Sequence, residues 1–246
     1  MRARSLSFLL KYKNKFVRSV YFFYNIYFRN LRYLSNSSQF NEDKFILNFF
    51  KKKNNGKFLD MGCYHPTRDN NTYQLYKKGW RGINIDLNSL SIELFNFLRP
   101  RDINLNFGLS KKKGLKKIYF LGDFSPLNTL DKNHLKFLNK NFQIKINSLK
   151  SKYIETENIN NILKKYKYIK IDFLSIDLEG YEYEILSTLD FNKYKIHLLC
   201  IEVLSHNLKS KNNYKKIIKL LKINNFKIIY KNQVNYFFKN SKWNFQ

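Results

Sequence analysis

The chain has 246 residues, of which 43% are hydrophobic and 17% are aromatic. This composition excludes an intrinsically disordered chain and is sufficient for one packed domain with a short extension. Forty-six Lys and Arg against 18 Asp and Glu give a net charge of +28. The charge indicates either a nucleic acid or anionic membrane partner, or only a solvated, lysine-rich surface. The second alternative stays open because Lys, Asn, Ile, Phe and Tyr are abundant together, a pattern that AT-rich coding produces without selection for binding.

Cysteine content and hydropathy bear on the cellular compartment. Cys63 and Cys200 lie in separate apolar segments without the spacing of a metal site, so we expect both to be reduced core residues. No stretch approaches the roughly 20 apolar residues that span a bilayer, and no secretory cleavage pattern follows the N-terminus. The sequence therefore predicts a cytoplasmic protein.

Residues 1–38 form a basic, aromatic N-terminal extension that we expect to be helical. Its first 33 residues contain eight Lys and Arg and no acidic residue, interleaved with Phe and Tyr. Such a segment could lie peripherally at the inner face of an anionic membrane. It could equally pack on the domain or cover an active site.

The remaining elements follow in chain order. Phe45, Ile46, Phe49 and Phe50 have helical spacing, which predicts a helix that ends near Asn54. Strands are expected at 57–62, 82–86, 103–107, 173–177 and 197–203, helices at 90–98, 159–166 and 214–223, and a closing hairpin at 226–230 and 235–238. Segment 109–168 is less regular, with a further possible strand at 143–146. Strands that alternate with helices predict an α/β fold with a mainly parallel sheet.

The string KFLDMGCYHP places Asp60 and Gly62 at the end of the first expected strand. In an open parallel sheet, ligands bind at these carboxyl ends, and a glycine lets the backbone approach a cofactor closely. Tyr64 and Thr67 stand where a dinucleotide-binding loop would have further glycines, which argues against a pyrophosphate site. The alternative is an ordinary turn after a strand.

Asp86 ends the second expected strand, 24 residues after Gly62. A carboxylate at this position can accept both hydrogens of a ribose diol. Alternatively, Asp86 and Asn88 only cap the helix that follows.

The string SIDLEGYE places Asp177 and Glu179 at the carboxyl end of the fourth expected strand. Both side chains should open into the same cleft as the first loop, unless one of them caps a helix starting near Gly180. Asp177 and another carboxylate could hold a divalent metal. Because no third ligand is evident, the sequence predicts no metal site.

Three strings in this order resemble FkbM-type methyltransferases: FLDMGCYHPTRDNNTYQLYKKGWRGINID, RPRDINLNFGLS and DFLSIDLEGYEYEIL. The resemblance extends over about residues 40–202. It implies a Rossmann-like class I methyltransferase fold over residues 39–246, with a seven-stranded, mostly parallel sheet, helices on both faces and a closing antiparallel strand. It also implies an S-adenosylmethionine-dependent O-methyltransferase that modifies a hydroxyl of a saccharide, glycan precursor or related small molecule.

The resemblance assigns cofactor contacts to the ends of the first three strands. These are Asp60 and Gly62 beside the methionine part, Tyr64 in the same loop, Asn71 and Thr72 beside the methionine carboxylate, Asp86 at the ribose, and Asn106 and Phe107 beside the adenine. Cys63 and Tyr64 stand where Ala and Asn are more usual in the family.

Methyl transfer requires alignment of the acceptor oxygen and removal of its proton. We expect Glu179 to be the base and Asp177 to orient the acceptor or cofactor. His206, and also His65, could line the same site. Two alternatives stay open: a nucleic-acid methyltransferase, which the charge favours but the absence of an Asn-Pro-Pro-Tyr-type motif disfavours, and a non-catalytic nucleotide- or membrane-binding module.

Overall fold

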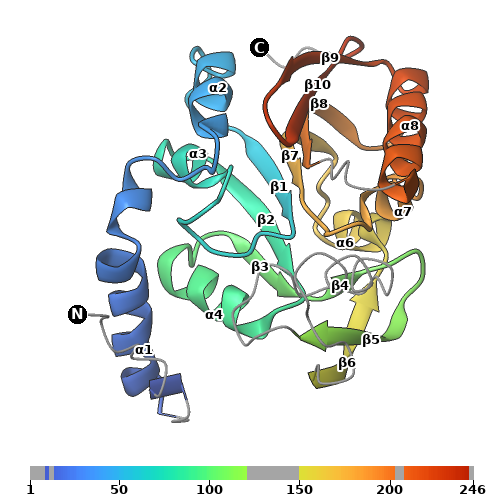
Figure 1. The fold of residues 1–246 in the computed structure, drawn as a ribbon. Coiled ribbons are helices and arrows are strands. Elements are labelled where there is room, and N and C mark those ends of the chain that lie inside the picture. Colours follow the sequence, from blue (N-terminus) through green and yellow to red (C-terminus); the bar gives the residue numbers. More distant parts are fainter. Residues whose placement is uncertain (1–8, 11–13, 121–149, 203–207, 244–246) are drawn as a thin grey trace.

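The computed structural model describes residues 9–10, 14–120, 150–202 and 208–243 (Figure 1). The strands of its main sheet are β1 (Lys57–Met61), β2 (Arg81–Asp86), β3 (Ile103–Asn106), β7 (Lys170–Ile176), β8 (Lys195–Glu202), β9 (Phe226–Lys231) and β10 (Asn235–Asn240). They lie in the order β3-β2-β1-β7-β8-β10-β9. The first five are parallel, and β10 pairs antiparallel with both β8 and β9. The predicted seven-stranded, mostly parallel sheet with a closing antiparallel strand is confirmed.

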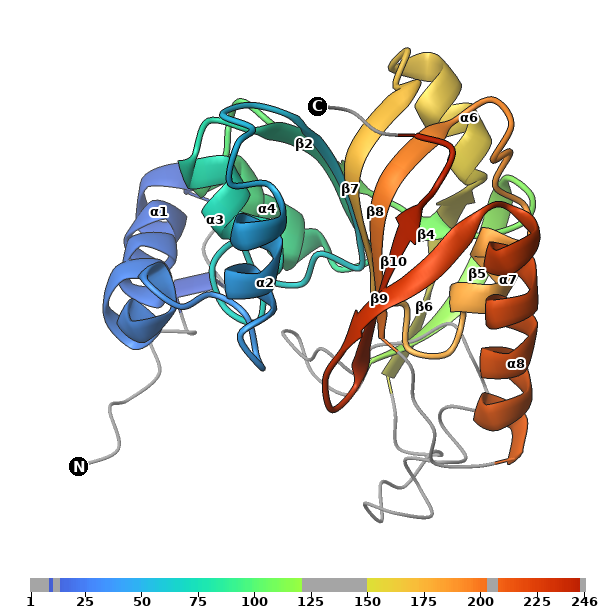
Figure 2. The same ribbon diagram turned by 90° about the horizontal axis from the view of Figure 1, so that it is seen from above.

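Helices cover both faces of this sheet (Figure 2). On one face lie α2 (Glu42–Phe49), α3 (Tyr73–Lys77) and α4 (Ser89–Leu98), and on the other α6 (Ile159–Lys165), α7 (Glu182–Leu186) and α8 (Leu208–Ile223). Side chains alternate along β1, so that Phe58 packs with α2 and α3 residues while Leu59 and Met61 join the core that includes α6, α7 and α8. Helix α2 ends at Phe49, earlier than the expected Asn54, and irregular turns follow it.

A second sheet of three strands lies beyond the carboxyl ends of the parallel strands (Figure 1). It consists of β4 (Gly108–Leu109), β5 (Gly114–Phe120) and β6 (Lys150–Glu157) in the order β4-β6-β5. The sequence did not predict β5 or β6, because lysines interrupt their apolar residues. The strand expected at 143–146 and the candidate residue His206 lie outside the described residues.

The described part of the N-terminal segment is helical over residues 15–29 and 31–34. It consists of α1 (Lys15–Phe23), a π-helical turn (Tyr24–Arg29) and a 3₁₀ turn (Leu31–Leu34). Tyr21, Phe22 and Ile26 pack against Leu90 and Leu94 of α4. One side of the segment therefore packs on the domain. Within the described part of the chain, no helix is both long and apolar enough to cross a membrane.

Candidate active site

The order of strands in the main sheet reverses between β1 and β7, and ligands of open α/β sheets bind at the carboxyl side of such a point. Here the turns after the two strands touch. The N–H of Asp177 donates to the carbonyl of Met61 (2.9 Å), and a Cβ at Gly62 would lie 1.7 Å from the carbonyl oxygen of Asp177. Gly62 also has a φ of 81°. Only glycine meets both requirements, so Gly62 joins the first loop to the turn that holds Asp177.

The Asp60 side chain is buried beneath the first loop and is hydrogen-bonded to residues of that loop rather than exposed to solvent. Its Oδ2 accepts hydrogen bonds from Nδ2 of Asn70 (3.1 Å) and from the hydroxyl of Thr72 (2.8 Å). Burial raises the pKa of Asp60, although these bonds and the charge of Arg99 oppose the rise. In this structure, therefore, Asp60 and the Thr72 side chain position residues 70–72.

Arg99 is fully buried below the same loop. Its guanidinium donates to the hydroxyl of Thr72 (2.9 Å), to Oδ1 of Asn70 (2.7 Å) and to the carbonyl of Pro66. A buried cation of this kind requires several acceptors and a nearby anion. Arg99 thus holds both ends of the loop that follows β1. Sequence analysis did not single it out.

Asp86 links the turns after β1 and β2. Its Oδ2 accepts from the backbone N–H of Tyr64 (2.8 Å), and its Oδ1 accepts from the N–H of Asn88 (2.7 Å). Asn88, not Asp86, caps α4, because its side chain accepts from the N–H of Leu90. The Asp86 side chain stays partly exposed, while desolvation raises its pKa to about 7. Each carboxylate oxygen keeps a lone pair for a further donor.

The residues expected beside the adenine lie next to Asp86. Asn106 pairs with Asp86 in the register of β2 and β3, and its Nδ2 donates to the carbonyl of Asp86 (2.9 Å). The partly buried Phe107 follows directly. On the other side, Nδ2 of Asn71 donates to the hydroxyl of Ser175 on β7 (3.3 Å). The carboxyl edge of the sheet thus brings the predicted cofactor residues together.

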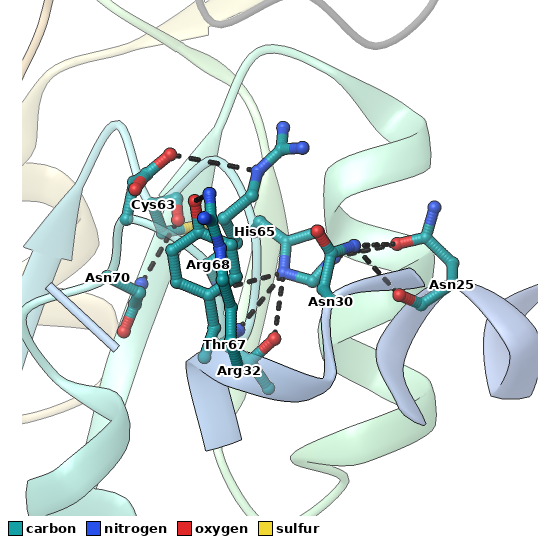
Figure 3. Close-up of polar contacts among 10 residues, drawn as sticks. Asn25, Asn30, Arg32, Cys63, His65, Thr67, Arg68 and Asn70 are labelled. Atoms are coloured by element: carbon teal, nitrogen blue, oxygen red, sulfur yellow. Dashed lines mark hydrogen bonds and ion pairs between the residues drawn. The ribbon is translucent and has the colours of Figure 1, made fainter. Parts of the chain in front are cut away.

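His65 connects the first loop to the N-terminal segment (Figure 3). Its Nδ1 accepts from the backbone N–H groups of Thr67 (3.1 Å) and Arg68 (3.0 Å), so Nε2 bears the proton and donates to Oδ1 of Asn25 (2.8 Å). Burial, followed by the charges of Arg99 and Arg29, lowers the pKa of His65 to about 3. The ring is neutral and fully buried, which favours a structural role over a catalytic one.

Three carboxyl groups converge at the ends of β7 and β8. Oxygen atoms of Asp177, Glu179 and Glu202 lie within 4.8 Å of one another. Neither Asp177 nor Glu179 caps α7, because its N-cap residue is Tyr181 and no side chain makes a capping hydrogen bond there. Glu182, in the first turn, accepts from the N–H groups of Leu178 and Gly180 (both 3.0 Å). The capping alternative is therefore wrong for both residues. Glu179 has a φ of 50°, in the left-handed region that non-glycine residues rarely adopt.

Burial and the charge of a neighbouring carboxylate raise the pKa of each of the three groups. Desolvation and then the charge of Glu202 raise the pKa of Asp177 well above its usual value, although Asp177 itself is solvent-exposed. Desolvation and the charge of Asp177 do the same for Glu179. Desolvation and the charge of Glu179 raise the pKa of Glu202 to about 7. Near neutral pH the cluster therefore holds at least one proton and can exchange it with a ligand.

Glu202 was missing from the sequence-based site. Ile176 of β7 pairs with Ile201 of β8, so Glu202, the last residue of β8, lies beside Asp177. The available signal was an acid at the end of an apolar strand, but the adjacency of the two strands was unknown. The expectation that no third metal ligand exists was wrong, because Glu202 lies beside Asp177 and Glu179. Three carboxylates are a donor set that Mg²⁺ or Ca²⁺ accepts.

Comparison with known proteins agrees with this geometry. The family model described as "Methyltransferase FkbM domain" matches residues 60–228, which is more than half of the chain and includes the first loop and all three clustered carboxylates. No curated protein matches the chain in sequence. The match and the seven-stranded sheet show that this chain belongs to the FkbM methyltransferase family.

Proposed function

We propose that the protein is a cytoplasmic, S-adenosylmethionine-dependent O-methyltransferase that acts on a hydroxyl of a saccharide, glycan precursor or related small molecule. One observation supports this proposal above all. Three carboxyl groups with raised pKa lie beside the loop that follows β1, which contacts the backbone of Asp177 at Gly62. A hydroxyl is a weak nucleophile, and a nearby carboxylate of raised pKa is a suitable base for it.

The residues at the carboxyl edge suit S-adenosylmethionine. Asp86 would accept the ribose hydroxyls through its remaining lone pairs, and Asn106 and Phe107 would border the adenine. Asp60, Gly62, Tyr64 and Thr72 would shape the methionine end, Asp60 and Thr72 through the contacts that order residues 70–72. A site for a dinucleotide pyrophosphate would instead need further glycines where Tyr64 and Thr67 stand.

When bound, S-adenosylmethionine supplies an electrophilic methyl group on a positive sulfur. Glu179 would accept the proton that the acceptor hydroxyl loses as its oxygen takes up the methyl group. Asp177 and Glu202 are linked by a hydrogen bond. They would orient the acceptor and hold a further proton beside Glu179. The enzyme contributes alignment and proton removal.

Calorimetry with S-adenosylmethionine and S-adenosylhomocysteine tests the cofactor assignment. We expect both ligands to bind, and Asp86→Ala to weaken binding roughly tenfold to hundredfold, because about two hydrogen bonds to a charged group are lost. Glu155→Ala removes an exposed carboxylate on β6 and should bind like the wild type. Absence of binding by folded wild-type protein would exclude the proposed function.

A label-transfer screen identifies the acceptor class. Transfer of a labelled methyl group to saccharides, with none to RNA, is the expected result. The net charge of +28 favours RNA as the second candidate acceptor. Labelled RNA, together with a salt-dependent mobility shift, would replace the saccharide assignment. Binding of cofactor without transfer to either class would favour a non-catalytic module.

A further inference from the structure

The N-terminal segment has a second apolar face that no described residue covers. Phe16, Val20 and Phe23 follow one another at i, i+4 and i+7 along α1 and so share one side of the helix. Their exposed fractions are 77%, 45% and 50%. The segment continues into Phe28 and Leu31, exposed to 66% and 61%.

Ring contacts join the exposed Phe23 and Phe28 to each other and to Tyr24 and Tyr27. The ring of Phe23 lies 4.9 Å from that of Tyr27 and 5.9 Å from that of Phe28, and the ring of Tyr24 stacks on Phe28 at 6.5 Å. Single exposed apolar residues are common, but contiguous apolar patches usually mark a contact surface. We call the surface formed by Phe16, Val20, Phe23, Phe28 and Leu31 the N-terminal apolar face.

The segment that bears this face is rich in positive charge. Lys15, Arg29 and Arg32 are exposed on the same segment, whereas Arg18 pairs with Glu93 of α4 at 2.5 Å. Arg29 also contributes to the lowered pKa values of His65 and Arg68. No acidic residue precedes Glu42, and Arg2, Arg4, Lys11 and Lys13 precede α1 in the sequence. A ligand of the N-terminal apolar face should therefore have both apolar and anionic groups.

We propose that the N-terminal apolar face binds an anionic phospholipid membrane, with its aromatic and aliphatic side chains among the acyl chains and the basic residues at the headgroups. This arrangement is typical of helices that lie in the plane of a membrane interface. Val20 and Leu31 gain from lipid but not from nucleic-acid phosphates, and a second copy would bring two positive faces together. The proposal does not depend on the methyl acceptor.

Vesicle sedimentation tests this inference with the full chain. We expect binding to vesicles of phosphatidylcholine mixed with phosphatidylglycerol, weakening with salt, and little binding to phosphatidylcholine alone. Phe16→Ser with Phe23→Ser should lower the partition coefficient at least about tenfold. Arg29→Gln and Arg32→Gln should each lower it about fivefold.

Matched controls come from exposed apolar residues elsewhere. Leu115→Ser and Ile223→Ser change residues exposed to 67% and 70% outside the N-terminal apolar face and should bind vesicles as the wild type does. Circular dichroism and thermal unfolding establish that each variant is folded. Equal binding to both vesicle types, or no loss in folded Phe16→Ser/Phe23→Ser protein, would overturn the proposal. So would RNA binding or dimerisation that requires these residues while vesicles are not bound.

Discussion

Oδ1 of Asn25 lies 2.8 Å from Nε2 of His65, so a residue of the N-terminal segment is hydrogen-bonded to the first loop of the active site. Asn25 is itself held by Asn30, whose Nδ2 donates to the Asn25 carbonyl (2.7 Å) and to its Oδ1 (3.0 Å). All three residues are buried. The extension thus contributes to the order of a loop more than 30 residues away.

Asn25→Ala should remove the acceptor that Oδ1 of Asn25 offers to the buried Nε2–H of His65. We expect a loss of about 1–3 kcal/mol in the free energy of unfolding and weaker binding of S-adenosylmethionine, because the loop is less well ordered. Urea denaturation and calorimetry measure the two effects. Ser19→Ala, which removes only an exposed bond to the Lys15 carbonyl, is the control. Unchanged stability and affinity in Asn25→Ala would show that the contact is dispensable.

Arg99→Met should destabilise the protein by about 3–5 kcal/mol, because it leaves the buried Asp60 without its cation and Thr72 and Asn70 without a donor. Adding Asp60→Asn should restore part of the loss, since the uncompensated charge is then removed. A double-mutant cycle of unfolding free energies measures this coupling. Strict additivity of the two changes would contradict an interaction between these residues.

Glu179→Gln should lower turnover about 10²- to 10⁴-fold while cofactor affinity stays within about twofold of the wild type. The raised pKa of Glu179 means that wild-type turnover declines on acidification at a pH above the usual range of a glutamate. Glu155→Gln, on β6, serves as the control. The pH profile of turnover, measured once an acceptor is known, distinguishes a base from a binding residue. Unimpaired turnover in Glu179→Gln would remove it as the base.

Glu202→Gln should change the pH dependence of stability. Because the pKa of Glu202 is about 7 in the folded protein and near 4.5 unfolded, the folded state binds more protons between these values. The stabilising free energy from protonated Glu202 is present below pH 4.5 and is lost as the pH rises to about 7. The variant should therefore gain roughly 1–2 kcal/mol over the wild type at pH 8, after allowance for partial solvent exposure, and little at pH 5. A constant difference between pH 5 and 8, measured by denaturation, would refute the raised pKa.

Much of the fold was predictable because its signals are local. The apolar runs ending in Asp60, Asp86 and Asp177 marked parallel strands whose carboxyl ends meet at one edge, and the structure has them there. The closing hairpin was evident from apolar residues on either side of Asn232. Each of these features depends on one short, continuous stretch of sequence.

The contacts that complete the site depend on pairs distant in the sequence. Glu202 joins Asp177 through the register of two strands, and Asn25 joins His65 across 40 residues. Arg99 looked like the end of a helix, yet its guanidinium lies beneath the first loop. Periodicity contains no information on such pairings, and the identity of a polar residue does not reveal which distant residue it hydrogen-bonds.

The contact between Gly62 and the Asp177 carbonyl has a thermodynamic consequence. No side chain separates the two turns, so we expect a change in the loop after β1 to alter the turn that holds Asp177. A ligand at one turn should then change the affinity of the other turn for its ligand, and the factor is the same in both directions. Calorimetry of cofactor binding with and without acceptor would reveal this coupling, and equal affinities would show that the two turns respond separately.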